Sequence, residues 1–190
     1  MKVFNSPSKV RGASLIEILV SLLLIAVGLT AMANMINYSL NSNTNASNRA
    51  LATMMANEFA ELVRSNPDEM SASTPAYIRA ATYTDIAGAA NRNVANLASG
   101  LCDYPNCVSN TLATRDVAVF SRRLRAALPA GDFTTAAVSA TQFDLWIFWM
   151  EAQTTANTGN TERNSDNCPS AVRSIAANQR PRCYYVRVAL

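Results

Sequence analysis

Residues 18–33 form an apolar stretch without a single charge, and one carboxylate, that of Glu17, stands directly before it. The only polar interruptions are Ser21 and Thr30. A membrane-spanning helix needs about 17–25 such residues, so the stretch is long enough once its apolar flanks are included. An isolated ionised carboxylate is costly in hydrocarbon unless it finds a partner. The sequence therefore predicts one long helix whose first half lies in a membrane or in the core of a fibre, with Glu17 in need of a nearby cation.

A short basic segment precedes the carboxylate and ends in a glycine, Gly12. It carries three positive charges, at Lys2, Lys9 and Arg11. Such charges mark the cytoplasmic end of an apolar helix. Cleavage after Gly12 would create a free amine at Ala13, and Glu17 would become the fifth residue of the shortened chain. A carboxylate in the first turn is also favoured by the helix dipole. We therefore expect the amine at Ala13, of the same chain or of a neighbouring one, to neutralise Glu17.

The run Arg11-Gly12-Ala13-Ser14-Leu15-Ile16-Glu17, with the apolar helix behind it, resembles the signal of type IV prepilins. In that family a basic leader, a glycine, a Ser-Leu-Ile-Glu core and an apolar helix follow in this order. The resemblance implies that a prepilin peptidase removes residues 1–12 on the cytoplasmic side and methylates the new amine at Ala13. The family most often has Phe at that position. The departure bears on methylation more than on cleavage, because Gly12 is kept.

Two plainer interpretations compete with a prepilin signal. An ordinary secretory signal fits poorly, because no A-x-A-like cleavage site follows a short apolar core. A simple signal anchor would also place an apolar helix near the amino terminus. The order and spacing of the motif favour the prepilin interpretation over both.

This interpretation divides the chain into a leader at 1–12, a long helix at 13–65 and a periplasmic globular head at 66–190. The formal charge of +3 belongs to the leader. Of the 16 basic residues three lie there, and the 13 that remain equal the 13 acidic residues. The basic isoelectric point therefore gives no support to nucleic-acid binding.

All four cysteines lie in the part of the chain that we place outside the inner membrane, where disulfides persist. Four cysteines allow three connectivities. We expect local pairing, Cys102 with Cys107 and Cys168 with Cys183, because short loops close at lower entropic cost. A zinc site is the rival interpretation. It is disfavoured because the chain has no His and neither cysteine pair has the usual C-x2-C spacing.

The remaining chain alternates loops with regular elements. The long helix is expected to end near Ser65-Asn66-Pro67, because a residue before proline resists the helical region. Polar residues 41–48 are a weak point that would fray or kink it. A surface loop with short helical turns is predicted over 68–101, a second helix over 114–128, and strands over 133–139, 142–151 and 183–190. The inward stripe of the long helix is predicted to hold Leu51, Met54, Met55, Phe59, Leu62 and Val63.

The residue inventory disfavours catalysis and cofactor binding. Without His there is no Ser-His-Asp or Cys-His site, no phosphate-binding glycine loop is present, and no carboxylate pair stands out. The basic group Arg122, Arg123 and Arg125 could bind DNA or an acidic partner, but the solvated face of a helix explains it more simply. Trp146 and Trp149 could form a ligand platform. On an alternating strand they point to opposite faces, which favours core packing for one and a subunit contact for the other.

A weaker resemblance extends beyond the leader. Asn48-Arg49-Ala50-Leu51 and residues 56–67 are similar to the helix end of minor pilins of the PilV type. So is a helix closing in Leu128-Pro129-Ala130-Gly131, followed by an aromatic strand and a final Cys-Tyr-Tyr strand. The resemblance implies an α+β type IV pilin fold, in which a long N-terminal helix packs on a small antiparallel sheet. It also implies an assembly component and not an enzyme.

The function implied is that of a minor type IV pilin. Such a protein waits in the bacterial inner membrane as a single-pass protein with its head in the periplasm. It then joins other minor pilins and the major pilin to prime pilus assembly at or near the tip, supporting twitching motility and adhesion. A tip adhesin is a further candidate partner. The alternatives are a minor pseudopilin of type II secretion, a DNA- or surface-binding adhesive pilin and, last, a signal-anchored periplasmic enzyme.

Overall fold

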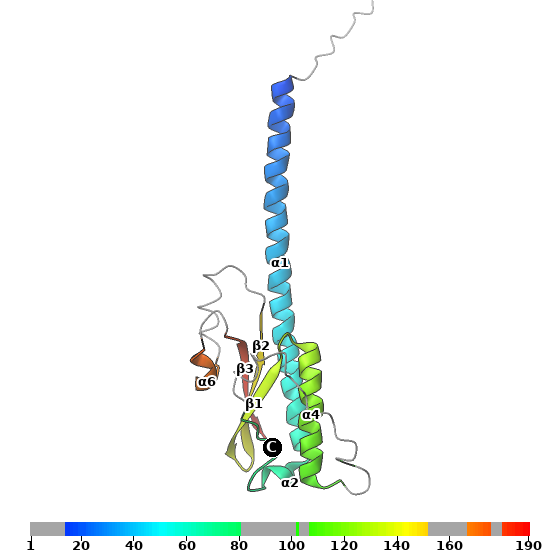
Figure 1. Cartoon of the computed structure of the whole chain (residues 1–190), viewed down its shortest axis with the longest axis vertical. Helices are drawn as coiled ribbons and strands as arrows, with labels where there is room; N and C mark the ends of the chain where they lie inside the picture. Colours follow the sequence, from blue (N-terminus) through cyan, green and yellow to red (C-terminus); the bar gives the residue numbers. More distant parts are fainter. Residues whose placement is uncertain (1–13, 81–101, 103–106, 152–166, 176–179) are drawn as a thin grey trace, which may run out of the picture. The chain divides into compact units, whose positions relative to one another are not determined.

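The computed structural model describes residues 14–80, 102, 107–151, 167–175 and 180–190 (Figure 1). The elements along the chain are α1 (Leu15–Arg64), α2 (Pro67–Met70), α4 (Ser109–Ala127), β1 (Asp132–Ser139), β2 (Gln142–Trp149), α6 (Ser170–Arg173) and β3 (Arg182–Ala189). A long N-terminal helix followed by a small antiparallel sheet confirms the predicted α+β class. The chain forms two compact units, and the boundary between them lies inside α1, between Ser42 and Asn43.

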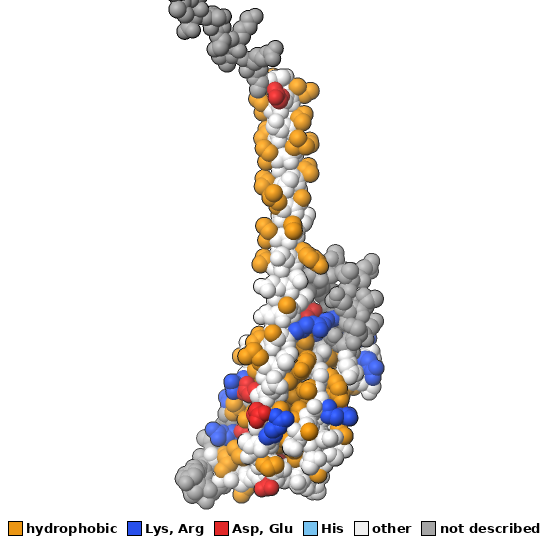
Figure 2. Space-filling model, turned by 180° about the vertical axis from the view of Figure 1, so that it is seen from behind, with side chains coloured by type: hydrophobic (Ala, Val, Ile, Leu, Met, Phe, Trp, Pro, Cys, Tyr) orange, Lys and Arg blue, Asp and Glu red, His pale blue; other side chains and the backbone are white. Residues whose placement is uncertain are grey.

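In the first unit, α1 is apolar on every side. Figure 2 shows hydrophobic side chains all along the face of this helix that it presents. The large apolar residues from Leu15 to Leu40 are exposed, and the helix is long and apolar enough to cross a membrane. Ser21 and Thr30 donate their hydroxyl protons to carbonyls of their own helix, those of Glu17 (2.7 Å) and Val27 (2.8 Å). Both polar groups are therefore satisfied without water.

The polar residues 41–48 do not end the helix. α1 is continuous over its 50 residues, although this segment was predicted to fray or kink it. The boundary between the two compact units does fall within it. Asn48 is already buried, so the polar segment is where α1 begins to have an inward side.

In the second unit, the core lies between the second part of α1, α4 and one face of the sheet. Phe59 of α1 is its centre. Its ring centroid lies 4.8 Å from that of Phe120 on α4 and 5.0 Å from that of Phe133 on β1. The rings of Tyr77 and Phe143 meet it edge-on, each at 6.1 Å. Such tilted and edge-to-face arrangements are the favoured geometry of aromatic pairs.

The inward stripe of α1 differs from the predicted one at Met54, whose side chain is 67% exposed. The buried positions instead follow alanines spaced by four, namely Ala52, Ala56 and Ala60, together with Met55, Phe59 and Val63. Residues four apart lie on one helix face, and Met54 falls off that face. Large apolar residues were easy to recognise in the sequence, whereas the alanines that mark the true stripe were not.

The strands form a sheet in the order β1-β2-β3, antiparallel throughout. All three predicted strands are present, with ends shifted by one or two residues. Alternate residues of β2 enter the core, among them Phe143 and Trp149. Trp146 points to the other face, where its ring lies 5.2 Å from that of Tyr185 on β3. The two tryptophans thus have the opposite orientations that strand alternation predicts.

In the described part of 68–101 the prediction of short helical turns is right, but the prediction that the segment lies at the surface is wrong. The short helix α2 carries the buried Met70, and Tyr77 is almost fully buried in the core. The remaining residues 81–101 lie outside the described part of the chain. Helix α4 also begins at Ser109, earlier than the predicted 114. Its first turn was missed because Ser109 and Asn110 have no apolar side chain to show the helical period, and both are used for tertiary hydrogen bonds.

The turn after α4 holds the chain in a conformation that only particular residues permit. The amide of Gly131 donates to the carbonyl of Leu128 at 2.9 Å, and Ala130 has φ of 52°. A Cβ atom on Gly131 would lie 2.6 Å from the backbone oxygen of Leu124. The turn therefore excludes a side chain at Gly131 by contact, and at Ala130 it accepts one under strain.

We predict that two small substitutions in this turn change the stability of the head by different amounts. Gly131→Ala should destabilise the head by about 1–3 kcal/mol, since backbone must move to admit the methyl group. Ala130→Gly should change stability by less than about 1 kcal/mol, because relief of the left-handed strain offsets the greater freedom of the unfolded chain. Thermal unfolding of the full chain in detergent, followed by tryptophan fluorescence, measures both. Equal losses from the two variants would contradict the proposed turn geometry.

Candidate functional site

The first turn of α1 places Glu17 where the sequence motif requires it. The amides of Glu17 and Ile18 donate to the carbonyl of Ser14 at 3.0 and 3.2 Å, which closes the first turn. Glu17 is the acidic residue of that turn, and its side chain is exposed. Gly12 and Ala13 lie outside the described residues. The described part of the site is thus an exposed carboxylate at the head of an apolar helix, placed where the positive end of the helix dipole favours it.

The surroundings of Glu17 are apolar. Leu15, Ile16, Ile18 and Leu19 are all exposed beside it. If these side chains are covered by lipid or by other helices, the carboxylate enters the same low-dielectric layer, where an unpaired charge is costly. This is a strong requirement for a cationic partner at the same depth.

The described residues contain no cluster of side chains suited to bind a metal ion. Among them no group of three His, Cys, Asp or Glu side chains could hold a metal ion.

Both disulfides expected from the sequence are present in the structure, with the local pairing chosen there. Cys168 and Cys183 are buried together with Phe148 and Val172 in a second, smaller core. This core lies on the face of the sheet that the main core leaves free, because Cys183 pairs with Phe148 across β2 and β3. The bond therefore attaches the segment before α6 to the first residues of β3.

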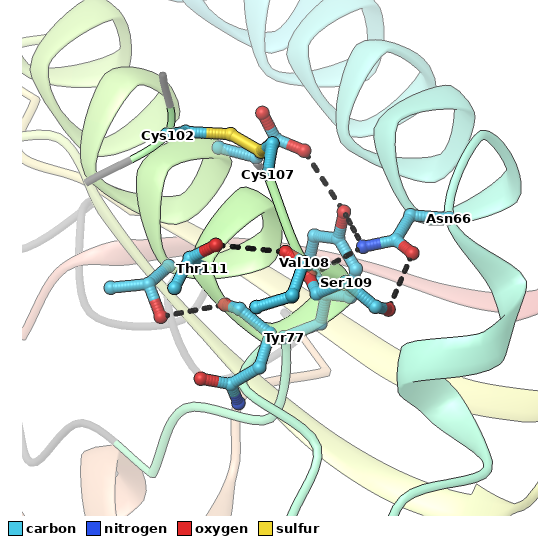
Figure 3. Close-up of a disulfide and its surroundings, with 10 residues drawn as sticks. Asn66, Tyr77, Cys102, Cys107, Val108, Ser109 and Thr111 are labelled. Carbon is cyan, nitrogen blue, oxygen red and sulfur yellow. Dashed lines mark hydrogen bonds between the residues drawn. A yellow bond between two sulfur atoms is a disulfide. The ribbon is translucent and has the colours of Figure 1, made fainter. Parts of the chain in front are cut away.

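The other disulfide lies beside the end of α1 (Figure 3). Cys107 is followed by Val108 and by Ser109, the first residue of α4. Ser109 exchanges two hydrogen bonds with Asn66: the Asn66 amide donates to the Ser109 carbonyl at 2.9 Å, and the Ser109 hydroxyl donates to the Asn66 side-chain oxygen at 2.7 Å. The chain that leaves the Cys102–Cys107 loop is thus attached directly behind the last turn of α1.

The group Arg122, Arg123 and Arg125 on α4 is only partly the solvated face that the sequence predicted. Arg122 and Arg123 are exposed, as predicted, although Arg123 also forms an ion pair with Glu58 of α1. Arg125 is half-buried and lies 3.3 Å from the carboxylate of Asp132. Two of the three therefore bind acidic groups of the same chain, which weakens the case for a DNA-binding surface further.

A carboxylate clamp joins β2 to β3 on the face of the sheet away from α1. The guanidinium of Arg187 donates to both oxygens of Asp144, at 2.7 and 3.0 Å, and the Tyr185 hydroxyl donates to one of them at 3.0 Å. These hydrogen bonds, chiefly that from Arg187, lower the pKa of Asp144. Sequence analysis missed the clamp, because its partners are distant in sequence and meet only through the strand register.

Comparison with known proteins supports the interpretation of the amino-terminal segment. Residues 7–33 match the family model of the prokaryotic N-terminal methylation motif. The match contains Gly12, Ala13 and Glu17 and covers about a seventh of the chain. No curated protein matches the chain. No solved structure matches it either.

The motif defines a class of structural subunits and not of enzymes. It supports a type IV pilin-like protein, a pilin or a pseudopilin. In general it implies processing by a prepilin peptidase and assembly with other pilins. Together with the apolar part of α1, it is consistent with membrane anchoring and incorporation into a pilus.

We predict that the two disulfides contribute unequally to the stability of the head. Removal of Cys168–Cys183 by paired Ser substitutions should lower the melting temperature more than removal of Cys102–Cys107. The chain-entropy model gives on the order of 3 kcal/mol for a loop of about 15 residues and somewhat less for a shorter one, and the two sequence separations are 15 and 5. The larger loop also ends in a buried core.

Peptide mapping without reductant provides the control for this comparison. It should recover each of the two local pairs from the unmodified protein. A cross-linked peptide that contains Cys107 and Cys168 would rule out the pairing, and equal melting temperatures of the two variants would rule out the ranking.

Proposed function

We propose that this protein is a minor type IV pilin of the PilV type. It primes pilus assembly with other minor pilins, lies at or near the pilus tip, and supports twitching motility and adhesion. The observation that carries the proposal is Glu17, which begins an apolar helix directly behind a prepilin cleavage motif. Before assembly the protein resides in the bacterial inner membrane with residues 66–190 as a periplasmic head, and the major pilin and a tip adhesin are its further candidate partners.

The segments that resemble PilV-type minor pilins support this assignment, because they coincide with positions that the fold needs. Residues 56–67 contain Phe59, the centre of the aromatic core, and Asn66, which holds the start of α4. Residues 128–131 form the turn that excludes a side chain at Gly131. Similarity at such positions reflects a shared way of attaching a head to a helix. The two disulfides suit the oxidising periplasm.

Assembly is driven by the association of apolar helices. The exposed apolar side chains of residues 15–40 leave lipid and pack against those of other subunits. Glu17 is the one charged residue of this segment. The methylated amine at Ala13 of a neighbouring chain is the partner that we assign to this carboxylate. The pair then fixes the depth of each incoming subunit, since any other depth would leave the carboxylate unpaired in an apolar layer.

Deletion of the gene distinguishes this proposal from the closest alternative, a minor pseudopilin of type II secretion. A minor pilin predicts loss of twitching with normal secretion of exoproteins. Loss of secretion with normal twitching would assign the protein to the other system. For the adhesive alternative, filter binding of the purified protein to DNA over a series of salt concentrations is decisive, because phosphate contacts give a steep salt dependence.

We predict that the mature protein begins at Ala13 with a methylated amine. Cleavage after Gly12 places the amine within reach of the carboxylate that needs it. Mass spectrometry of the N-terminal peptide measures both the cut and the added methyl group. An intact leader, or a cut at residue 33 or beyond, would falsify the prepilin assignment.

We predict that Glu17→Ala leaves membrane insertion intact and impairs entry into the pilus complex. Insertion survives because the substitution removes a desolvation cost, and entry suffers because the amine of the neighbouring subunit loses its partner. Crosslinking to other minor pilins at matched protein levels is the measurement. Glu61→Ala is the matched control, since Glu61 is an exposed α1 carboxylate whose ion pair with Arg64 should be worth about 0–1 kcal/mol. Undiminished crosslinking of Glu17→Ala would exclude the pairing role.

A further inference from the structure

A group of polar side chains lies where the end of α1, the short helix α2 and the start of α4 meet. We call this group the α1–α4 joint. Its members come from four separate stretches of the chain and include two carboxylates, Glu69 and Asp116. The joint comprises Asn66, Glu69, Tyr77, Ser109, Asn110 and Asp116.

The hydroxyl of Tyr77 is the centre of the joint. It donates to Oδ2 of Asp116 at 2.9 Å and lies 3.4 Å from the carbonyl oxygen of Leu62, in the last turn of α1. The side-chain amide of Asn66 lies 3.4 Å from the same hydroxyl oxygen, which it approaches as a donor. Figure 3 shows Asn66, Ser109 and Tyr77 gathered at this point. One phenolic proton therefore faces two acceptors, a carboxylate on α4 and a backbone carbonyl on α1.

The carboxylates of the joint are held by neutral donors. Glu69 is 3% exposed, and its Oε1 accepts from the amide of Ala76 at 2.9 Å and from the side chain of Asn110 at 3.0 Å. Asp116 is half-buried and accepts from Tyr77. A buried carboxylate needs several hydrogen bonds or a nearby cation to offset the loss of water.

The charged groups around Asp116 do little to favour its ionised form. On α4 the nearby charge is the exposed Arg115, which lowers the pKa of Asp116. The facing segment contributes Tyr77, α2 contributes the second carboxylate, Glu69, and α1 presents the neutral amide of Asn66 and the Leu62 carbonyl. Burial is the strongest influence, and it raises the pKa of Asp116 above its usual range despite the hydrogen bond from Tyr77. Burial also raises the pKa of Tyr77, which keeps its proton.

Protonation of Asp116 reverses the direction of the hydrogen bond. The new carboxyl O–H can donate to the oxygen of Tyr77, and the phenolic proton is then free to turn to the carbonyl of Leu62. The proton comes from water, and no covalent bond other than the new O–H is made. The result is a directed chain from Asp116 through Tyr77 to Leu62, in which every donor has an acceptor.

We propose that the α1–α4 joint is a proton-operated latch, which holds the last turn of α1 more tightly to α4 in acid than at neutral pH. This inference concerns the attachment of the head to its helix. It stands whether or not the protein is a minor pilin.

The sign of the effect follows from linkage. The folded state raises the pKa of Asp116 above that of the unfolded chain, so the folded state binds the proton more tightly. The stability that the group contributes is therefore fully present below the unfolded pKa of about 3.9, and it is lost as pH rises through the folded value. Asp144 has the opposite sign, because Arg187 lowers its pKa.

Thermal unfolding of the full chain in detergent, from pH 4 to pH 8, tests the latch. Tryptophan fluorescence reports on the head alone, since both tryptophans lie on β2. Asp116→Asn should melt at a higher temperature than the wild type at neutral pH, and this advantage should disappear toward pH 4. Asp144→Asn is the matched control. It should melt at a lower temperature than the wild type at neutral pH, and this loss should persist down to about pH 4, because Arg187 holds the pKa of Asp144 below its usual range.

Two further variants locate the effect. Glu69→Gln should leave the pH-dependent advantage of Asp116→Asn in place, because Glu69 lies outside the proton chain. Tyr77→Phe keeps the ring but removes the hydroxyl. In the wild type, hydrogen exchange of the Ser65 and Asn66 amides, corrected for the intrinsic rate, should slow as pH falls. In Tyr77→Phe this slowing should be absent.

Three results would overturn the proposal. One is an Asp116→Asn melting difference that does not change with pH, and another is its disappearance in the Glu69→Gln background. The third is that hydrogen exchange of the Ser65 and Asn66 amides slows with falling pH in Tyr77→Phe as it does in the wild type. The Tyr77 hydroxyl would then have no part in holding the end of α1.

Discussion

The packing of Phe59 fixes the positions of most other parts of the head. Its ring contacts α4 through Phe120, β1 through Phe133 and β2 through Phe143. The buried alanines of α1, at 52, 56 and 60, let these elements approach the helix backbone closely. Because interiors are close-packed, a change at this one contact would move three elements at once. The polar α1–α4 joint depends on it too, since Tyr77 packs against the same ring.

The two parts of α1 have different surfaces. In residues 15–42 every large apolar side chain is exposed, as a lipid or a fibre core requires, whereas residues 43–64 have a single buried face. The polar stretch between them accepts either condition, because Asn, Ser and Thr can satisfy their hydrogen bonds with water or with the helix itself. A subunit with this design keeps its assembly surface separate from its head. Glu17 can then be selected for pairing, and Phe59 for packing, without conflict.

Sequence reasoning succeeded where the signal was a period or a motif. The long helix, the aromatic strand β2 and the motif around Glu17 are all of this kind, because apolar spacing and residue order are visible in one dimension. It failed where the deciding partner is remote. Met54 was predicted to face the core, but the buried face of α1 is the one that carries Ala52 and Ala56, and Met54 is exposed. Arg125 was assigned to water, although Asp132 draws it into a half-buried ion pair.

The α1–α4 joint illustrates the same limit at the level of chemistry. Nothing in the residues around Asp116 or Tyr77 distinguishes them in the sequence, and the segment that carries Tyr77 was predicted to be a surface loop. Their proximity results from the chain path around Phe59, which no local pattern encodes. A perturbed carboxylate can be recognised only when burial, hydrogen-bond partners and neighbouring charges are considered together.

The position of Cys183 has a consequence for the order in which the chain reaches its final form. β1 and β2 are joined by two residues and can pair early, as short hairpins do. β3 must close the much longer segment 150–181, a slower and entropically more costly step. Asn167 is held beside β2 by the indole of Trp146, so the neighbouring Cys168 waits close to where Cys183 must arrive opposite Phe148. The Cys168–Cys183 bond then holds β3 in place beside β2. Until β3 pairs, β2 is an open edge of the sheet, the kind of surface on which proteins aggregate.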